Sequence, residues 1–170
     1  YLKGEHEELR PWEPPGKGYT RVQQLLRRRA RLVQVKTALS QSFKELPELK
    51  RSAQAVLRQL NHLDALIKKR LRQALAEHGW RADVRRCEAI EGVGEVTAAA
   101  LTMSYNRGDF ANADAFIAFI GMDVRVRDSG RSKGKRKLTK QGDPELRRLL
   151  YLAAMTACRS ATWQPFYQRY

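Results

Sequence analysis

The sequence predicts an all-α fold, in which a helical coiled-coil hairpin is followed by a small helical domain that contains a helix-hairpin-helix and a basic loop. Two long segments, residues 20–46 and 48–78, carry apolar residues at alternating steps of three and four, which is the spacing of one face of an α-helix. Pro47 separates the two segments and Gly79 follows the second, and both residue types favour helix boundaries. The alternation typical of a β-strand is nearly absent and occurs only weakly, at Asp123–Arg127.

The two long segments define the expected coiled coil. We expect the first helix to start after Thr20 as its N-cap and to run to about Leu46. Its apolar seam comprises Val22, Leu25, Leu32, Leu39, Phe43 and Leu46, with Arg29 and Lys36 interrupting it. The second helix opens at Glu48, and its seam comprises Leu49, Ala53, Val56, Leu60, Leu63, Ile67 and Ala74. Seams of this length predict either an intramolecular hairpin or a dimer. The two polar seam residues of the first helix suit a partner that offers acids, phosphates or solvent.

Breakers and turns divide the remainder of the chain. Residues 1–19 hold Pro11, Pro14, Pro15, Gly16 and Gly18, and we expect them to form an extended linker. We expect short helices with tight turns over residues 81–120 and a further helix over residues 143–160. The predicted domains are therefore a hairpin over residues 20–78 and a helical domain over residues 80–170.

The segment Ile90–Ala98, IEGVGEVTA, has the pattern of a helix-hairpin-helix. Gly92 and Gly94 let the backbone approach a phosphate closely, and the helix that follows, with Thr97 in its first turn, presents its N-terminal amides to the anion. Such contacts hold the DNA backbone without reading its sequence. The alternative interpretation is a glycine-rich turn that only packs two helices together.

Charge limits the class of partner. The chain has 170 residues and a net charge of +15, which indicates a polyanionic partner, most commonly nucleic acid, with an anionic membrane surface as the weaker alternative.

No run of about 18 apolar residues is available to span a bilayer. Cys87 and Cys158 lack a CxxC spacing and are expected as reduced cytosolic thiols. No metal site is assigned, because no ligand spacing relates the three histidines, His6, His62 and His78.

The stretch Gly121–Gly142 is the strongest candidate for function. It is a basic loop that carries eight Lys or Arg residues and a single acid, Asp128, between Arg125 and Lys140, and the helical run Asp143–Arg159 follows it directly. Its candidate nucleic-acid-binding residues are Arg125, Arg127, Arg131, Lys133, Lys135, Arg136, Lys137 and Lys140. On composition alone this is a solvated basic segment that binds polyanions without chemistry.

The hydroxyl groups in this loop raise the question of catalysis. Composition does not distinguish Ser129 from Ser132 or Thr139 as a nucleophile. Arg127 and Arg131 lie on either side of Ser129 in the sequence, and guanidinium groups stabilise charge on an attacked phosphate. A serine needs a base or a strongly cationic setting to react, and no histidine is close in sequence, so a hydrolase triad fits poorly.

Four segments occur in an order that is more specific than any one of them: IEGVGEVTAAAL, DFANADAFIAFIGM, RDSGRSKGKRKLTKQGDPELRRLLYLAA and WQPFYQRY. Together they resemble the C-terminal transposase domain of the insertion-sequence-110 family of bacterial transposases, closely over residues 85–170. The linker and the helical hairpin also fit the layout of that family, in which a coiled coil joins two domains. The chain departs from the family pattern at Val124, where proline is frequent, and at Asp128, where a small residue is common.

The resemblance implies more than the residues do by themselves. It implies an RNA-guided recombinase with a bridge RNA, whose N-terminal RuvC-like domain binds magnesium through four acidic residues. The C-terminal domain supplies a serine that forms a covalent phosphoserine link to DNA, and the family's Ser-Gly motif falls here on Ser129–Gly130. We match no acidic tetrad in this chain, so residues 1–19 are expected to be the linker from a RuvC-like domain outside it, and no cofactor is expected here. The expected location is the bacterial cytoplasm, at the nucleoid.

The resulting hypothesis is a fragment of a DNA transposase that binds DNA and a bridge RNA and forms a dimer or tetramer through the coiled coil. One alternative is a non-catalytic helix-hairpin-helix module that binds nucleic acid, and another is a coiled-coil assembly protein in which Phe43 and Ile67 dominate function. Three consecutive arginines within Arg27–Arg31 favour a phosphate contact over solvent alone. The aromatic tail is expected to pack in a core, with base stacking as the alternative; it comprises Trp163, Phe166, Tyr167 and Tyr170.

Overall fold

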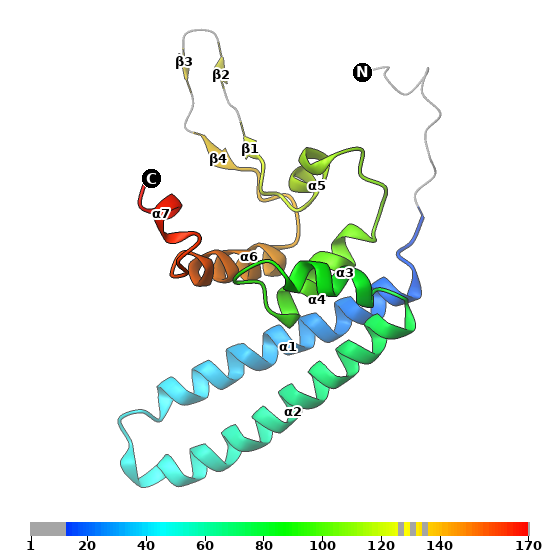
Figure 1. Cartoon of the computed structure of the whole chain (residues 1–170). Coiled ribbons are helices and arrows are strands. Elements are labelled where there is room, and N and C mark those ends of the chain that lie inside the picture. Colours follow the sequence, from blue (N-terminus) through cyan, green and yellow to red (C-terminus); the bar gives the residue numbers. More distant parts are fainter. Residues whose placement is uncertain (1–12, 126–127, 130–131, 134–135, 170) are drawn as a thin grey trace.

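The computed structural model describes residues 13–125, 128–129, 132–133 and 136–169, with only the backbone described at 128, 129, 132 and 133. These residues form seven α-helices, one short 3₁₀ helix and four strands of two residues each (Figure 1). The prediction of an all-α fold is confirmed, and the short strands are confined to the segment predicted as a basic loop.

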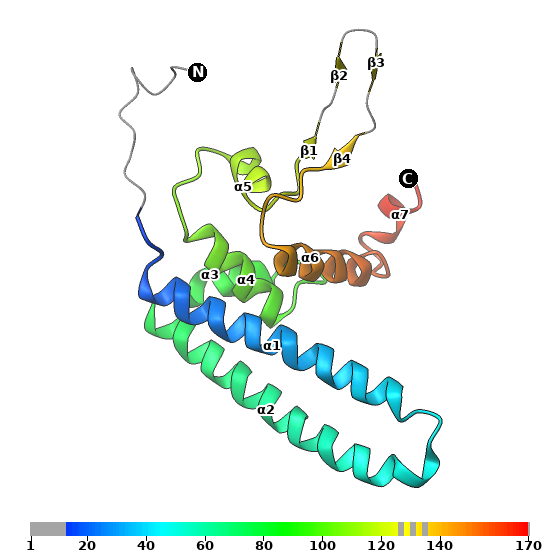
Figure 2. The same cartoon turned by 180° about the vertical axis from the view of Figure 1, so that it is seen from behind.

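Helices α1 (Lys17–Ser42) and α2 (Lys50–Glu77) form a long antiparallel hairpin, joined at its far end by the 3₁₀ helix η1 (Pro47–Leu49) (Figures 1 and 2). The prediction that Thr20 caps the first helix is wrong, because α1 begins at Lys17 after Gly16 and the Thr20 hydroxyl instead donates to the Gly16 carbonyl at 3.2 Å. The helix also ends at Ser42, four residues before the expected Leu46. Gly79 follows α2 with a positive φ of 73°, as expected for a helix-terminating glycine.

Only part of the predicted α2 seam packs inside the hairpin. The buried residues of α2 are Asp64, Leu71, Ala74 and Leu75. Leu49, Val56 and Leu63 were predicted to lie in the seam, but they are 42%, 49% and 46% exposed. They recur every seven residues, from Leu49 at the end of η1 to Val56 and Leu63 in α2, so they form one line on a flank that α1 does not cover. We call these three residues the exposed stripe.

Helix α4 (Glu95–Tyr105) is the centre of the core. Seven of its eleven residues are buried, and it contacts α1, α2, α3 (Arg81–Glu88) and α6 (Pro144–Ala157). Alanines at 98–100 let these neighbours approach closely, while the larger side chains of Leu71, Met103 and Leu146 are fully buried. Each such burial stabilises the fold by about 1.5–3 kcal/mol. This core anchors the inner end of the α1–α2 hairpin to the C-terminal helices.

The segment predicted as a basic loop is a β-ribbon. Strand β1 (Val124–Arg125) pairs antiparallel with β4 (Lys137–Leu138), and β2 (Asp128–Ser129) pairs antiparallel with β3 (Ser132–Lys133). The weak alternation at Asp123–Arg127 corresponds to β1. We call these four strands the basic ribbon, which extends from the helical body next to α5 (Ala113–Phe119) and points away from the α1–α2 hairpin (Figure 1).

The C-terminal segment differs from its prediction. After α6 the chain turns into the short helix α7 (Gln164–Tyr167), on the opposite side of the body from the α1–α2 hairpin (Figures 1 and 2). Trp163, Phe166 and Tyr167 are 44%, 56% and 59% exposed, so the prediction that this aromatic tail packs in a core is wrong for these three residues. Tyr170 lies outside the described residues. The core closes around α4 without these aromatic side chains.

Candidate nucleic-acid interface

The basic ribbon is closed at its base by two glycines that touch other backbone atoms. Gly121 has a φ of +71°, and a Cβ added there would lie 2.6 Å from the Gly142 nitrogen. A Cβ added at Gly142 would lie 2.3 Å from the carbonyl carbon of Ile120. Any larger residue at either position would force the two backbones apart. The two glycines that bracket the basic stretch in the sequence therefore form its base in space.

Hydrogen bonds hold the same base to the helical body. The Thr139 amide donates to the Asp123 carbonyl at 3.0 Å, the Lys140 amide donates to the Gly121 carbonyl at 3.2 Å, and the Thr139 hydroxyl donates to the Asp123 carboxylate. In α6, the Arg147 guanidinium donates to the Ile120 carbonyl at 3.2 Å. The ribbon therefore starts from a fixed point.

The backbone register places Ser129 opposite Ser132, and Asp128 opposite Lys133. Gly130 and Arg131, which connect the two serines, lie outside the described residues, as do Arg127 and Lys135. The sequence could not decide between the two serines, and the ribbon places them at the same level. An experiment on Ser129 therefore needs Ser132 as its control.

Several of the predicted binding residues lie along the lower part of the ribbon. Arg125, Arg136, Lys137 and Lys140 are exposed, and Arg125 is the cross-strand partner of Lys137. Like charges directly opposite each other destabilise a strand pair. A phosphate backbone beside β1 and β4 would relieve this repulsion, so the register itself favours a polyanionic partner.

The three residues of the α3–α4 turn that were predicted to bind phosphate lie in different surroundings. Gly92 has a φ of +87°, and an added Cβ would lie 2.3 Å from the Ala153 carbonyl oxygen of α6, so this glycine is required for packing. Thr97 is 7% exposed and lies inside the core. Gly94 is the N-cap of α4 and has open space where a Cβ would be. Of the three residues predicted to hold a phosphate here, Gly94 and Thr97 line the cavity beside this turn, whereas Gly92 lies against α6.

Cationic side chains from three helices surround this end of α4. A cavity of about 330 Å³ is lined by the first turn of α4 together with Arg29 of α1, Lys68 of α2 and Arg148 of α6. The first amides of an α-helix lack intrahelical partners and favour anions. The arrangement brings cationic side chains next to the first turn of α4, which are the donors that a phosphate site needs.

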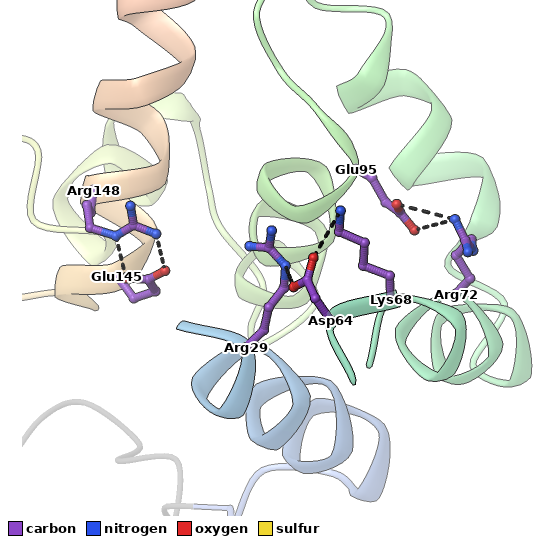
Figure 3. Close-up of polar contacts among 7 residues, drawn as sticks. All are labelled: Arg29, Asp64, Lys68, Arg72, Glu95, Glu145 and Arg148. Carbon is purple, nitrogen blue, oxygen red and sulfur yellow. Dashed lines mark hydrogen bonds and ion pairs between the residues drawn. The ribbon is translucent and has the colours of Figure 1, made fainter. Parts of the chain in front are cut away.

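Acidic side chains already neutralise these cations (Figure 3). The Arg29 Nε lies 3.0 Å and the Lys68 Nζ 3.4 Å from the two carboxylate oxygens of Asp64. The Arg29 Nε and the Asp64 Oδ1 form an ion pair, but the geometry between them is not that of a hydrogen bond. The pair answers the question raised by Arg29 in the apolar seam, since its acid comes from α2 of the same chain.

Two further pairs complete the set in Figure 3. Arg72 lies 3.1 Å from Glu95, which occupies the first turn of α4 where an external anion would bind. Arg148 donates to Glu145 at 2.6 and 2.7 Å, and these hydrogen bonds raise the pKa of Arg148 by stabilising its charged form. A phosphate would have to displace these acids. We therefore regard the basic ribbon as the stronger contact and the end of α4 as the weaker one.

A larger cavity of about 490 Å³ lies at the base of the ribbon, between α1 and α6. Its lining includes Tyr19, Arg27 and Asp143. Burial raises the pKa of Tyr19, and the Asp143 carboxylate adds to this effect, whereas Arg107 and Arg27 oppose it. The arginines of α1 point in different directions, since Arg27 and Arg28 are exposed and Arg29 faces Asp64.

Sequence reasoning missed Lys68, Arg72 and Arg148 as neighbours of the α4 end. They come from α2 and α6, and only the packing around α4 brings them to the turn. Among the residues near this end of α4, Arg29 alone was recognisable from the sequence, because it places a charge in an apolar seam. Within the part of the chain that the structure describes, no group of three or more His, Cys, Asp or Glu residues is placed to hold a metal ion. No helix among these residues is both long and apolar enough to cross a membrane.

Comparison with known protein families identifies the class of protein to which this chain belongs. A family model described as a transposase of the IS116/IS110/IS902 family matches residues 84–170, which is just over half of the chain and runs from within α3 through α7. The chain is therefore a transposase sequence, and its partner is DNA. It belongs to the IS116/IS110/IS902 family of transposases. A search of curated proteins found no match to the chain.

Proposed function

We propose that this chain supplies the serine nucleophile for DNA strand cleavage and exchange, and that Ser129 is that serine. The observation that carries the proposal is the position of Ser129 in β2 of the basic ribbon, which extends from the helical body on a fixed base. A nucleophile on such a projection can reach a phosphodiester without requiring the duplex to enter a cavity. The match of residues 84–170 to a transposase family supports the same assignment.

The chemistry that we propose conserves the number of phosphate ester bonds. The Ser129 oxygen attacks phosphorus, an oxygen–phosphorus bond forms to the serine, and the bond from phosphorus to one DNA oxygen breaks. The serine loses a proton and the departing DNA oxygen gains one. Because the covalent intermediate is again a phosphodiester, a new DNA hydroxyl can attack it and reseal the strand without an external energy source.

Stabilisation of the attacked phosphate comes from the cations of the ribbon. Arg125 and Lys137 are exposed cross-strand partners in the described part, and Arg127 and Arg131 flank Ser129 in sequence. Guanidinium and ammonium groups next to developing negative charge lower the barrier of phosphoryl transfer. Asp128 opposes anion binding beside the nucleophile, and its cross-strand partner in the register is Lys133.

Two components of this proposal lie outside the described residues. As the resemblance implies, four carboxylates of a RuvC-like domain would hold magnesium, which would supply Lewis-acid stabilisation of the scissile phosphate. A bridge RNA would select the DNA sites. Within the described residues, the cationic ribbon is the surface best suited to contact either nucleic acid.

We also propose that two or more protomers pair through the exposed stripe, which runs from the end of η1 along α2. Strand exchange requires at least two nucleophiles held together. The stripe leaves three large apolar side chains, Leu49, Val56 and Leu63, at the heptad spacing that coiled coils use.

A second candidate function is a non-catalytic helix-hairpin-helix module. Gly94 favours it, because this N-cap has open space in front of it and cations around it. Such a module would bind DNA with a steep dependence on salt and would form no covalent product.

The test is a covalent adduct between the protein and DNA. The transposase would be incubated with its guide RNA and DNA substrates and run on a denaturing gel. We expect an adduct with the unchanged protein and with Ser132→Ala, and no adduct with Ser129→Ala, because only the latter lacks the attacking oxygen.

Other results would contradict the assignment. An adduct lost in Ser132→Ala and kept in Ser129→Ala moves the nucleophile across the ribbon. An adduct in no variant, with DNA binding intact, favours the non-catalytic module.

A further inference from the structure

The exposed aromatic residues around α7 are not used by the proposed chemistry. Trp163, Phe166 and Tyr167 form a cluster within five residues of sequence, and about half of each side chain contacts solvent. The Trp163 and Phe166 rings pack edge to face, with centroids 6.3 Å apart and planes 87° apart. In this geometry each ring covers at most one face of the other. Large flat surfaces are thus left open on a protein whose core closes elsewhere.

The charge of the surrounding segment indicates what covers these rings. Between Leu146 and Tyr170 the sequence has no Asp or Glu. It has four arginines over the same range: Arg147, Arg148, Arg159 and Arg169. Arg159 and Arg169 flank α7 in the sequence and are exposed, and a neutral apolar partner would offer them no counter-charge. The complementary ligand has flat faces and a negative backbone.

Unpaired nucleic acid has both properties. Aromatic side chains stack on exposed bases irrespective of base identity, and arginines track the backbone. Duplex DNA does not offer these faces, because its bases already stack on one another. Strand exchange leaves DNA bases unpaired.

We propose that Trp163 and Tyr167, with Arg159 and Arg169, bind single-stranded DNA by stacking with its bases. This surface is separate from the ribbon that carries Ser129, and it holds the strand that is displaced during exchange. The inference rests on the proposed function only for the source of that strand. The binding itself is a property of this chain.

The experiment measures affinity for four probes of equal length: single-stranded oligothymidine, the same strand without bases, duplex DNA and single-stranded oligouridine. The variants are Trp163→Leu and Tyr167→Leu, which keep apolar bulk and lose the ring. Tyr167→Phe keeps the ring, and Tyr105→Leu removes an equally exposed tyrosine (57%) from the end of α4. Circular dichroism checks that each variant folds.

We expect each of Trp163→Leu and Tyr167→Leu to weaken binding of oligothymidine about five- to a hundredfold. Binding of the base-free strand and of the duplex should change less than twofold, and Tyr167→Phe and Tyr105→Leu should bind as the unchanged chain does. The fluorescence of Trp163, taken as the difference between the unchanged chain and Trp163→Phe, should be quenched by oligothymidine and not by the base-free strand.

Three outcomes overturn the proposal. Unchanged oligothymidine binding in both leucine variants excludes stacking, and an equal loss of affinity for all probes shows that the rings do not recognise bases. A loss confined to oligouridine identifies RNA as the occupant instead. Loss of the Ser129-dependent adduct with normal strand binding, or the reverse, shows which of the two proposals has failed.

Discussion

At the scale of single residues, Gly92 is the position where a role in folding and a role in binding make opposite predictions. Gly92→Ala would place a Cβ 2.3 Å from the Ala153 carbonyl oxygen on a backbone with a φ of +87°. We expect the free energy of unfolding to fall by about 2–4 kcal/mol, from backbone strain and overpacking together. Urea denaturation measures this change.

Gly108→Ala is the matched control, because an added Cβ there meets nothing within 4 Å. We expect its stability to change by less than about 1 kcal/mol. Normal stability of Gly92→Ala combined with weaker DNA binding would contradict the packing role and restore the phosphate role.

The residue scale also shows what a sequence can reveal about a site. Arg29 was recognisable as a charge that needed a partner, but Asp64 lies 35 positions away and no local pattern links the two. Gly92 and Gly94 belong to the same glycine pattern in the sequence, but Gly92 lies against α6 and Gly94 has open space around it. Only the position of α6 behind the turn distinguishes the glycine that packs from the glycine that is open.

At the scale of elements, the basic ribbon combines a repulsive cross-strand pair with a binding surface. Arg125→Glu would place opposite charges across β1 and β4, which we expect to leave stability unchanged or to raise it by about 0.2–1 kcal/mol. The same change should weaken binding to duplex DNA and reduce the slope of log K against log salt by about 1. Titrations at several salt concentrations, with urea denaturation in parallel, measure both effects.

Arg51→Glu provides the comparison for this ribbon variant. It carries the same change of charge at an exposed site near the start of α2, far from the ribbon. If both variants weaken binding equally, net charge rather than the ribbon governs the contact.

The ribbon also marks the limit of prediction for elements. The long helices followed from apolar spacing, because burial along one face requires that spacing. The strands have two residues each, which is too short for an alternating pattern. The base of the ribbon depends on close contacts that Gly121 and Gly142 make with backbone about 20 residues away in the sequence, and no local pattern predicts those contacts. The seam of α2 was assigned to one face, whereas the structure divides it between the buried side and the exposed stripe, because α1 covers only one flank.

At the scale of the whole molecule, the charge of the chain governs how far its copies can assemble. A net charge of +15 opposes association of free protomers. Bound nucleic acid removes this repulsion, so pairing through the exposed stripe should depend on DNA or RNA. The exposed stripe and the basic ribbon lie on different parts of the body, which allows both to be occupied at once (Figure 1).

Leu63→Asp tests this assembly, because it places a charge in the middle of the exposed stripe. Leu63 is 46% exposed in the single chain, so the variant should fold with nearly unchanged stability. In the nucleic-acid complex, however, burying an unpaired carboxylate in a coiled-coil contact is costly. Light scattering should therefore report a dimer or larger particle for the unchanged protein and a single protomer for the variant.

Ala65→Asp is the matched control for this change. It adds the same charge at an exposed site two residues further along α2, on a different face of the helix. We expect it to assemble as the unchanged protein does. Equal particle masses for all three proteins would mean that the exposed stripe makes no contact between protomers, and the two nucleophiles needed for strand exchange would then have to be held together by another surface or by the nucleic acid itself.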